Sequence, residues 1–582
     1  MDKLHVAKVL NELSVLMDLK GENPFKVRAF QNAARIIEGL TQDIDELVRT
    51  KTIGEIKGIG KGLAEKITEL VTTGQLQYYE ELKSSLPSGV PEMLRIQGLG
   101  PKKVKVLYEK LGIDSVENLR KAASAGQLRS VEGFGEKTEQ NILKGIELLQ
   151  ASGNKKLYPE AYAAAGPILA MLKGLKEVKR FEVAGSLRRK KEVIGDIDIV
   201  VSADQKHRAP IMKRFVAHKD VATVLAHGDT KSSVSLDSGI NCDLRIVKDS
   251  EYAFALNYFT GSKEHNVEMR SRARDKGWSL NEYAFSVATD SKTKPKKSPP
   301  KCTDEAEIYS SLGLAYVPPE LREMMGEFEA AEADSIPALV EEKDLKGTFH
   351  CHTTYSDGMN TLEEMAKGAK KKGWEYLGIA DHSQIAAYAG GLTPEKVRQQ
   401  LRAIDRFNES AQNFRLFKGT EVDILSDGSL DFNDKTLSGF DYVVASIHSK
   451  FKMTEAEGTK RLIKALKNRY VTTLGHPTGR LLLGREGYPV NMVEVINAAS
   501  DYGKALEINA HPQRLDLDWR LVKYARDKKV LIFINPDAHT VDGLDDVRYG
   551  VNVARKGWLE ARHVVNTMST KNVEKFLRSM TN

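Results

Sequence analysis

Beyond residue 340, the chain contains seven apolar runs that each end in histidine, aspartate or glutamate. Six of the runs are followed by helix-like stretches rich in Lys, Ala, Leu and Glu. Alternating strands and helices of this kind predict a parallel sheet closed into a distorted (β/α)7 barrel, with the polar strand ends gathered at one rim. The runs are GTFHCHTTYSDG (347–358), YLGIADHS (376–383), FRLFKGTEVDI (414–424), YVVASIHS (442–449), YVTTLGHP (470–477), ALEINAHP (505–512) and VLIFINPDAH (530–539).

Histidines are concentrated in the same part of the chain, where 8 of the 13 occur. One histidine at a strand end is more often a turn residue than a ligand, but seven polar strand ends at one rim favour a metal site. His350 and His352 alternate along a strand, so both point inward while Cys351 points away. Imidazole and carboxylate ligands without thiolates leave Mn²⁺, Zn²⁺ and Fe²⁺ open.

Composition sets outer bounds on the protein. A length of 582 residues predicts several domains, and a net charge of +7 is compatible with a polyanionic partner. No apolar run approaches the ~20 residues of a membrane span, and the N-terminal segment lacks signal-peptide features. The three cysteines, Cys242, Cys302 and Cys351, are too dispersed for a disulfide framework. We therefore expect a cytoplasmic protein without a membrane partner.

The motif GDIDIV (195–200) places two like charges in a short apolar strand. Asp196 and Asp198 share one face of that strand because side chains alternate with period two. A solvated strand-end turn would explain this pair alone. However, NCDLRIV (241–247) supplies a third carboxylate, Asp243, and a Gly-Ser turn followed by arginines precedes the motif. Three short acidic ligands beside a phosphate-binding turn predict two-Mg²⁺ nucleotidyl transfer, in which the cations offset the repulsion.

The first 150 residues repeat a Gly-apolar-Gly pattern between short helices, in the stretches 56–67, 95–107 and 130–143. One occurrence fits a simple bundle turn, but three resemble helix-hairpin-helix motifs, which hold DNA phosphates at helix N-termini. The resemblance implies DNA contacts at Gly58, Gly60, Lys66, Gly98 and Gly100.

The stretch NYFTGSKEHNVEMRSRARDKGWSLNEYAF (257–285) resembles the corresponding stretch of the family X DNA polymerases, the group of DNA polymerase beta. The resemblance implies that Asp196, Asp198 and Asp243 are catalytic and hold two Mg²⁺ ions. It also implies a DNA contact at Arg270 and nucleotide contacts at Gly185, Ser186, Arg189, Tyr258, Phe259, Gly261 and Asn266. Gly185, Ser186 and Arg189 would bind the triphosphate, Tyr258 and Phe259 would lie against the sugar, and Asn266 would reach the base.

The barrel pattern resembles the PHP domain that is fused to bacterial family X polymerases. The resemblance implies a 3′→5′ exonuclease with about three Mn²⁺ or Zn²⁺ ions, in some members also acting on abasic sites or 3′-phosphates. The implied ligands are His350, His352, Asp357, His382, Glu421, His448, His476, Asp537 and His539. His511 and Arg514 lie near the same rim, where a phosphate contact and a surface role are equally open.

The expected organisation is a lyase-like helical domain (1–85), a helix-hairpin-helix fingers-type domain (86–149), a nucleotidyltransferase palm (150–258), a thumb (259–320), a linker (321–345) and the PHP domain (346–582). Asn241 departs from the arginine of the animal relatives, which leaves the environment of Asp243 open. Gly62 and Tyr78 replace two phosphate-binding lysines of the lyase site, so we expect Lys66 to contact phosphate. The stretch 291–301 reads as a flexible basic loop.

We therefore expect a monomeric repair polymerase, cytoplasmic and nucleoid-associated, that acts on gapped or primer-template DNA with deoxynucleoside triphosphates. Three alternatives stay open at this point. The barrel could be a structural, catalytically inert domain, the chain could be a non-catalytic scaffold, or the palm could belong to an untemplated transferase.

Overall fold

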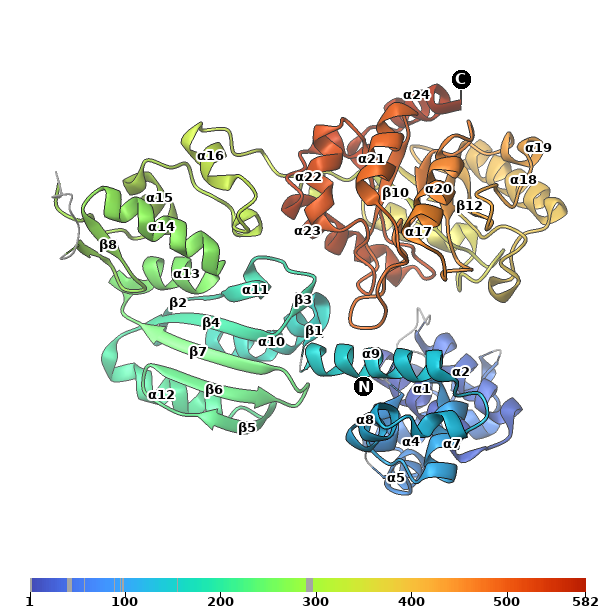
Figure 1. Ribbon diagram of the computed structural model, residues 1–582, viewed down its shortest axis with the longest axis horizontal. Helices are drawn as coiled ribbons and strands as arrows, with labels where there is room; N and C mark the ends of the chain where they lie inside the picture. The colour runs from blue at the N-terminus through green and yellow to red at the C-terminus, as the bar shows by residue number, and fades with distance from the viewer. Residues whose placement is uncertain are drawn as a thin grey trace. The chain divides into compact units, whose positions relative to one another are not determined.

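The computed structural model describes residues 3–38, 44–56, 58–87, 89–94, 96, 99–153, 155–288 and 297–581. The chain divides into two compact units, Met1–Gly153 with Thr540–Asp542 and Asn154–His539 with Gly543–Asn582 (Figure 1). Among the described helices, none is both long enough and apolar enough to cross a bilayer.

The first unit is helical and has two hydrophobic cores. Val6, Leu10 and Leu13 of the first helix belong to one core, whereas Leu16 and Leu19 of the same helix belong to the other. This helix therefore joins the two halves. The helices are α1 (Lys3–Lys20), α2 (Pro24–Glu38), α3 (Ile44–Arg49), α4 (Lys61–Thr73), α5 (Gln77–Ser84), α6 (Gly89–Met93), α7 (Pro101–Leu111), α8 (Val116–Ser124) and α9 (Glu136–Ser152).

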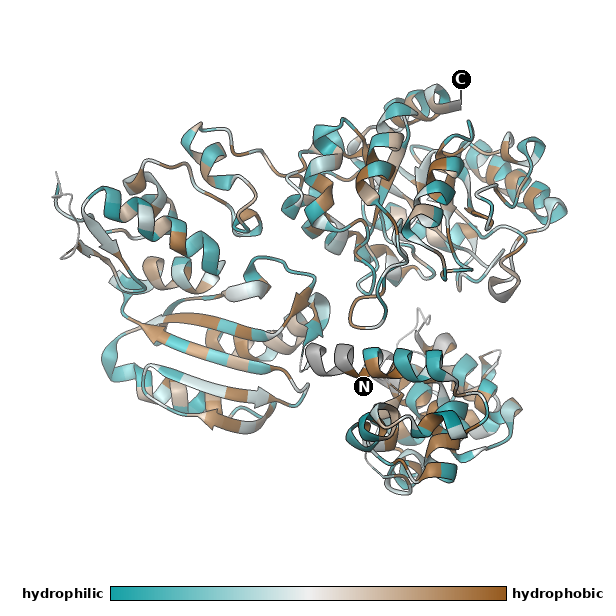
Figure 2. Ribbon diagram, in the orientation of Figure 1, coloured by the Kyte–Doolittle hydropathy of each residue, from teal (hydrophilic) through white to brown (hydrophobic). Residues whose placement is uncertain are grey.

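The second unit begins with a five-stranded sheet in the order β2-β4-β7-β6-β5. β4 runs parallel to β7, and the other neighbours are antiparallel. In Figure 2 the hydrophobic colour of β4 and β7 is interrupted by hydrophilic positions, as expected where one face of a strand carries polar groups. The elements are β1 (Lys156–Leu157), α10 (Tyr158–Lys173), β2 (Val178–Val183), α11 (Gly185–Arg188), β3 (Val193–Ile194), β4 (Asp196–Ala203), α12 (Gln205–Val216), β5 (Val221–Ala226), β6 (Lys231–Leu236) and β7 (Asn241–Val247).

A smaller α+β part follows the sheet. Its core contains Trp278, Phe285 and Tyr309, and it also includes Trp558 from the barrel. The thumb-side core and the barrel are therefore packed together in this unit. The elements are α13 (Tyr252–Thr260), α14 (Lys263–Asp275), β8 (Trp278–Leu280), β9 (Phe285–Val287), α15 (Glu305–Leu312), the 3₁₀ turn η4 (Pro319–Leu321) and α16 (Glu327–Glu332).

The C-terminal part is a seven-stranded parallel sheet in sequential order from β10 to β16. It is nearly closed, because Ala538 exchanges backbone hydrogen bonds with β10, from His352 N to Ala538 O (2.8 Å) and from Ala538 N to His350 O (3.2 Å). The predicted seven-stranded barrel is confirmed. Its strands are β10 (Gly347–Cys351), β11 (Tyr376–Ile379), β12 (Arg415–Asp423), β13 (Tyr442–Ser446), β14 (Thr473–Leu474), β15 (Ala505–Asn509) and β16 (Ile532–Asn535).

Helices surround the barrel, and aromatic side chains fill one end of it. Phe349, Tyr376, Phe417, Tyr442 and Phe533 are fully or almost fully buried in one cluster. They leave the opposite end, where the strands terminate, for polar groups. The helices are α17 (Leu362–Lys371), α18 (Pro394–Ser410), α19 (Asp434–Leu437), α20 (Glu455–Leu466), α21 (Met492–Asp501), α22 (Trp519–Asp527), α23 (Val547–Lys556) and α24 (Thr570–Thr581).

Candidate active sites

The parallel pairing of β4 with β7 brings the carboxylates of the sheet together. Asp198 lies opposite Asp243, and Asp196 lies opposite Asn241. Asp196 is exposed and Asp198 is partly buried, while Ile197 between them is fully buried. The three carboxylates therefore share one face of the sheet, as the alternation of side chains requires.

The electrostatics of this acidic cluster are those of a cation site. Burial, followed by the charges of Asp196 and Asp243, raises the pKa of Asp198 to about 6. Lys231 of β6 extends to Asp243, with Nζ 2.7 Å from Oδ2. In the described part of the chain, the three carboxylates do not form a set whose oxygens all lie within 4.8 Å. Short carboxylate side chains that repel one another fit Mg²⁺, which would offset their repulsion.

Lys231 is a residue that sequence reasoning missed. The cross-strand register sets Ser233 opposite Asp243 and places Lys231 on the same face, two residues away. Lys231 places a cation beside Asp243, whose environment was left open by Asn241 in place of the arginine of the animal relatives. Only the pairing of β6 with β7 identifies it, because Lys231 and Asp243 are 12 positions apart in the sequence.

The phosphate-binding turn lies directly against the carboxylates. Gly185, the first residue of α11, has φ +58°, and a Cβ there would come within 2.4 Å of Asp198 Oδ2. Only glycine fits that conformation and that approach. Ser186 follows it, and Ala184 N donates to Asp198 O at 2.7 Å. The structure thus brings the predicted triphosphate-binding residues next to the predicted metal ligands.

The remaining predicted nucleotide contacts gather around the end of α13. The rings of Tyr258 and Phe259 lie 5.2 Å apart in an edge-on arrangement, and Asn266 Nδ2 donates to Tyr258 O at 2.7 Å. A Cβ at Gly261 would lie 3.1 Å from Arg189 Nη1, which links this segment to the turn. Arg270 is exposed one turn after Asn266, whose carbonyl accepts from Arg270 Nε at 3.3 Å.

Replacing Asp198 with asparagine tests the cation-free state of this site. A folded pKa near 6, above the ordinary 3.8, means that the neutral carboxyl stabilises the fold below pH 4. This contribution is lost as the pH rises through 6. In chelator at pH 8 we expect Asp198→Asn to stabilise the protein by about 2 kcal/mol, seen as a higher Tm. The gain should vanish at pH 4.

Asp204→Asn is the control, because Asp204 is an exposed aspartate paired with Lys179, and it should give no gain. A Tm of Asp198→Asn at or below that of the wild type at pH 8 would contradict the raised pKa of Asp198.

Glu421 is the centre of a second polar cluster at the strand ends of the barrel. Its side chain is fully buried and lies between four imidazoles. Oε2 is 3.3 Å from His350 Nε2 and 3.0 Å from His382 Nδ1, while Oε1 is 3.1 Å from His448 Nε2 and 3.0 Å from His476 Nε2.

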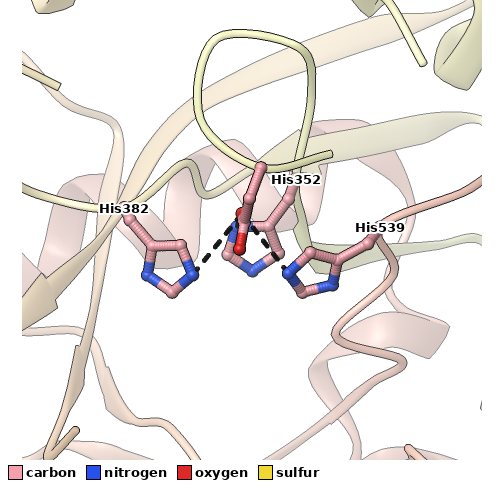
Figure 3. Close-up of side chains that lie close together, drawn as sticks. His352, His382 and His539 are labelled. Atoms are coloured by element: carbon pink, nitrogen blue, oxygen red, sulfur yellow. Dashed lines mark ion pairs between the residues drawn. The ribbon is translucent and has the colours of Figure 1, made fainter. Parts of the chain in front are cut away.

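Asp357 is the centre of an adjoining group. Its Oδ1 lies 3.4 Å from His539 Nε2, 3.7 Å from His382 Nε2 and 3.8 Å from His352 Nδ1. Figure 3 shows the three labelled imidazoles around one carboxylate. Burial alone would raise the pKa of Asp357, but these histidines outweigh it and lower the pKa to about 2. His352 Nε2 also lies 3.1 Å from Asp537 Oδ1, so all nine residues implied by the family resemblance meet at this rim.

The chemistry of this cluster fits metal ions. Among the described residues, three groups of side chains offer ligand atoms that lie within 4.8 Å of one another: His352 with Asp357, His382 and His539; His350 with His352 and Asp537; His382 with Glu421 and His448. His350 Nε2 and His352 Nδ1 are buried and make no hydrogen bond in the part of the chain that the structure describes. Buried ring nitrogens of this kind are ordinarily satisfied by a metal or a polar partner.

Two further carboxylates, which sequence reasoning missed, orient the histidines. Glu507 Oε2 lies 2.7 Å from His350 Nδ1, and Asp423 Oδ1 lies 3.2 Å from His448 Nδ1. Each leaves Nε2 of its histidine directed toward the cluster, as in carboxylate–histidine–metal arrangements. The signal was present in the sequence, because Asp423 follows Glu421 by two residues on one strand and Glu507 lies in the run ALEINAHP.

His511 and Arg514 lie at the same rim. Arg514 Nε is 3.7 Å from Asp537 Oδ2. His511 and Arg514 are both partly exposed. Burial lowers the pKa of His511, and the negative charge of Asp537 acts in the opposite direction. Arg514 is therefore a cation directly beside the cluster.

Three of the predicted DNA contacts in the first unit, Gly58, Gly60 and Gly100, lie just before helices. Gly58 has φ +97°, and a Cβ there would come within 2.5 Å of Ile36, so glycine is required. Gly60 and Gly100 directly precede α4 and α7 in extended conformation. Lys66 Nζ lies 4.5 Å from the ring centroid of Tyr78, one of the two residues that replace lysines of the lyase site. Gly98 lies outside the described residues.

The palm-like sheet with its carboxylates and the barrel with its imidazole cluster together define a nucleotidyltransferase joined to a metal-dependent phosphoesterase. Matches to known protein families agree with this division. They are to a helix-hairpin-helix domain (residues 1–76), a SAM-like helix-hairpin-helix tandem (90–147), the DNA polymerase beta thumb (255–323) and the PHP domain (348–511).

Individual relatives resolve the class further. The chain is 39% identical to the DNA polymerase/3′-5′ exonuclease PolX of Bacillus subtilis (strain 168), over 99% of this chain and 100% of the relative. It is 26% identical to DNA polymerase lambda of Rattus norvegicus, over 55% of this chain and 56% of the relative. It is 29% identical to a probable phosphatase of Thermoanaerobacter sp. (strain X514), over 38% of this chain and 89% of the relative. The chain belongs to the family X DNA polymerases that carry a C-terminal PHP domain.

Proposed function

We propose that the protein is a DNA-directed DNA polymerase that fills gaps during DNA repair and trims 3′ ends with the PHP domain. One observation supports this most strongly. A chain that is similar along its whole length to a protein named DNA polymerase and 3′-5′ exonuclease has a separate acid-rich site for each activity.

In the palm, we assign Asp196, Asp198 and Asp243 to two Mg²⁺ ions. These ions supply acidification of the primer 3′-hydroxyl and charge neutralisation at the triphosphate. Gly185 and Ser186 bring backbone N–H groups and a hydroxyl to the phosphates, and Arg189 adds a cation. Tyr258 and Phe259 line the sugar, Gly261 allows the close approach, Asn266 reaches the base and Arg270 holds the template.

In the PHP domain, the nine residues around Glu421 and Asp357 would hold about three ions, with Mn²⁺ or Zn²⁺ suited to the nitrogen and oxygen ligands. Such ions supply an activated water and neutralise the phosphodiester oxygens. Arg514 would hold a substrate phosphate at the rim. Action on abasic sites or 3′-phosphates would use the same groups.

We further propose that residues 1–85 and 86–149 hold DNA phosphates through Gly58, Gly60, Lys66, Gly98 and Gly100. The palm would extend to 258, the thumb to 320, the linker to 345 and the PHP domain to 582. The protein would act as a monomer on nucleoid DNA in the cytoplasm, with Lys66 as a phosphate contact.

A DNA substrate with a one-nucleotide gap tests the proposal. The purified protein is incubated with and without deoxynucleotides, first in Mg²⁺ and then in Mn²⁺. We expect templated insertion of one nucleotide when nucleotides are present and stepwise 3′ shortening when they are absent. Extension of a single strand without a template would indicate an untemplated transferase, and an absence of both reactions would indicate a scaffold.

Replacing Glu507 with glutamine tests the metal cluster without relying on activity. The variant keeps the size of the side chain but removes the charge that holds His350 Nδ1. We expect Mn²⁺ affinity to fall roughly tenfold to a hundredfold, measured by calorimetric titration of the chelated protein. Glu494→Gln, at an exposed residue of α21, is the matched control and should bind Mn²⁺ like wild type. An unchanged Mn²⁺ affinity in Glu507→Gln would show that Glu507 does not orient His350 for metal binding.

A further inference from the structure

The segment that follows the phosphate-binding turn of the palm is held from the barrel. Lys556, the last residue of α23, has an exposed side-chain fraction of 1%. Its Nζ donates to Arg189 O at 3.0 Å and to Glu323 Oε1 at 2.9 Å. Three residues further along the palm segment, Glu192 accepts from Trp519 Nε1 at 2.9 Å and lies 3.1 Å from Arg520 Nη1. Barrel residues thus hold both ends of this short segment.

The Arg189 side chain is also engaged through Glu323. Arg189 Nε donates to Glu323 Oε1 at 3.1 Å, and Nη1 donates to Thr260 O. The same carboxylate oxygen therefore accepts from Arg189 and from Lys556. Burial alone would raise the pKa of Glu323, but these two cations outweigh it, so the pKa lies below its ordinary value. Glu323 is therefore an anion with two cations, one buried (Lys556) and one largely buried (Arg189).

This arrangement matters because Arg189 is the residue that has to reach the triphosphate. If Arg189 were the sole partner of Glu323, its departure would leave a buried carboxylate without compensation, which is strongly unfavourable. With Lys556 in place, the carboxylate keeps one cation while Arg189 turns toward phosphate. The bond from Lys556 to the Arg189 carbonyl meanwhile fixes the backbone from which the guanidinium extends.

We propose that Lys556 of the barrel is a positioning residue of the polymerase site, which neutralises Glu323 and thereby releases Arg189 to bind the incoming nucleotide. The inference rests on the proposed role of Arg189 in triphosphate binding. It makes the PHP domain a structural part of the nucleotide site, in addition to its own chemistry.

Lys556→Met in the full-length protein tests this role. Without the ammonium, Arg189 is the cation that directly contacts Glu323, and the carboxylate holds it more tightly. We expect the KM for deoxynucleotides and the Kd for Mg²⁺-bound nucleotide to rise roughly tenfold, with a smaller change in kcat and with 3′ trimming within about twofold of wild type. Lys523→Met is the matched control, because Lys523 is a barrel lysine whose Nζ donates to Met325 O instead. It should leave the KM unchanged.

A second substitution distinguishes the neutralisation of Glu323 by Lys556 from a role of Lys556 in holding the domains together. Glu323→Gln removes the anion that competes for Arg189, so we expect Lys556→Met/Glu323→Gln to recover most of the nucleotide affinity. Glu323→Gln alone should bind nucleotide at least as tightly as wild type. If Lys556 only held the domains together, the defect would persist in the double variant and trimming would fall as well.

The outcomes are distinct from failure of the proposed function. Wild-type protein that does not extend a primer would refute the function itself. An active wild type combined with an unchanged KM in Lys556→Met, or with a defect that Glu323→Gln does not relieve, overturns the inference. If Lys556→Met does not fold, weaker nucleotide binding by Glu323→Gln alone overturns it equally.

Discussion

Asp198→Ala is expected to reduce templated primer extension on gapped DNA by about a thousandfold or more, because the variant loses a carboxylate that we propose as a Mg²⁺ ligand. Burial and the neighbouring charges of Asp196 and Asp243 raise the pKa of Asp198 to about 6. Asp198 also lies between Gly185 and Asp243. Its removal therefore takes away the carboxylate that lies against the glycine turn and opposite Asp243. Single-nucleotide incorporation under single-turnover conditions is the measurement.

The same variant should degrade a 3′ end at the wild-type rate, because its substitution lies in the palm. Asp204→Asn is the control for extension. Asp204 follows the same strand but is exposed and pairs with Lys179 at the surface. Residual extension by Asp198→Ala within tenfold of wild type would mean that the carboxylates of β4 are not metal ligands.

Glu421→Gln is expected to have the reverse effect, with loss of 3′→5′ degradation by about a thousandfold and unchanged extension. The amide has the same shape but cannot balance the four imidazoles that lie within 3.3 Å of the carboxylate oxygens. We expect a lower bound-metal content after dialysis, measured by elemental analysis. That measurement shows whether the loss of activity has its cause in metal binding.

Glu409→Gln, at an exposed residue of α18, is the matched control for the barrel. Degradation that persists in Glu421→Gln would favour a structural barrel, and the trimming activity would then have to come from the palm. Loss of both activities in one variant would show that the two sites depend on each other.

The barrel was predictable because its pattern is periodic and local. Each apolar run of the C-terminal part contains one of the seven strands, and each of the nine ligands implied by the family resemblance lies in the C-terminal half of a strand or in the loop that follows it. In a parallel barrel the strand ends meet at one rim whatever the exact register. A reader of the sequence can therefore place His350 near Glu421 without knowing which atoms face each other.

Register and cross-domain contacts were not predictable in the same way. Lys231 reaches Asp243 because β6 pairs with β7 at one particular offset. A shift of one residue would turn it to the other face. The strand pattern of the sequence contains Glu507 and Asp423, but only the fold shows which imidazole nitrogens these two carboxylates contact.

The sequence by itself determined the order of the domains, the strands of the barrel and the residue types available for two candidate metal sites, because these follow from local periodicity and from motifs that share one strand or turn. Only the tertiary structure decided which charged groups neutralise each other, as with Lys556, Glu323 and Arg189. More than 130 positions separate Glu323 from Arg189, and more than 230 separate it from Lys556. Such pairs form through burial in a common low-dielectric contact, and no local pattern in the chain encodes them.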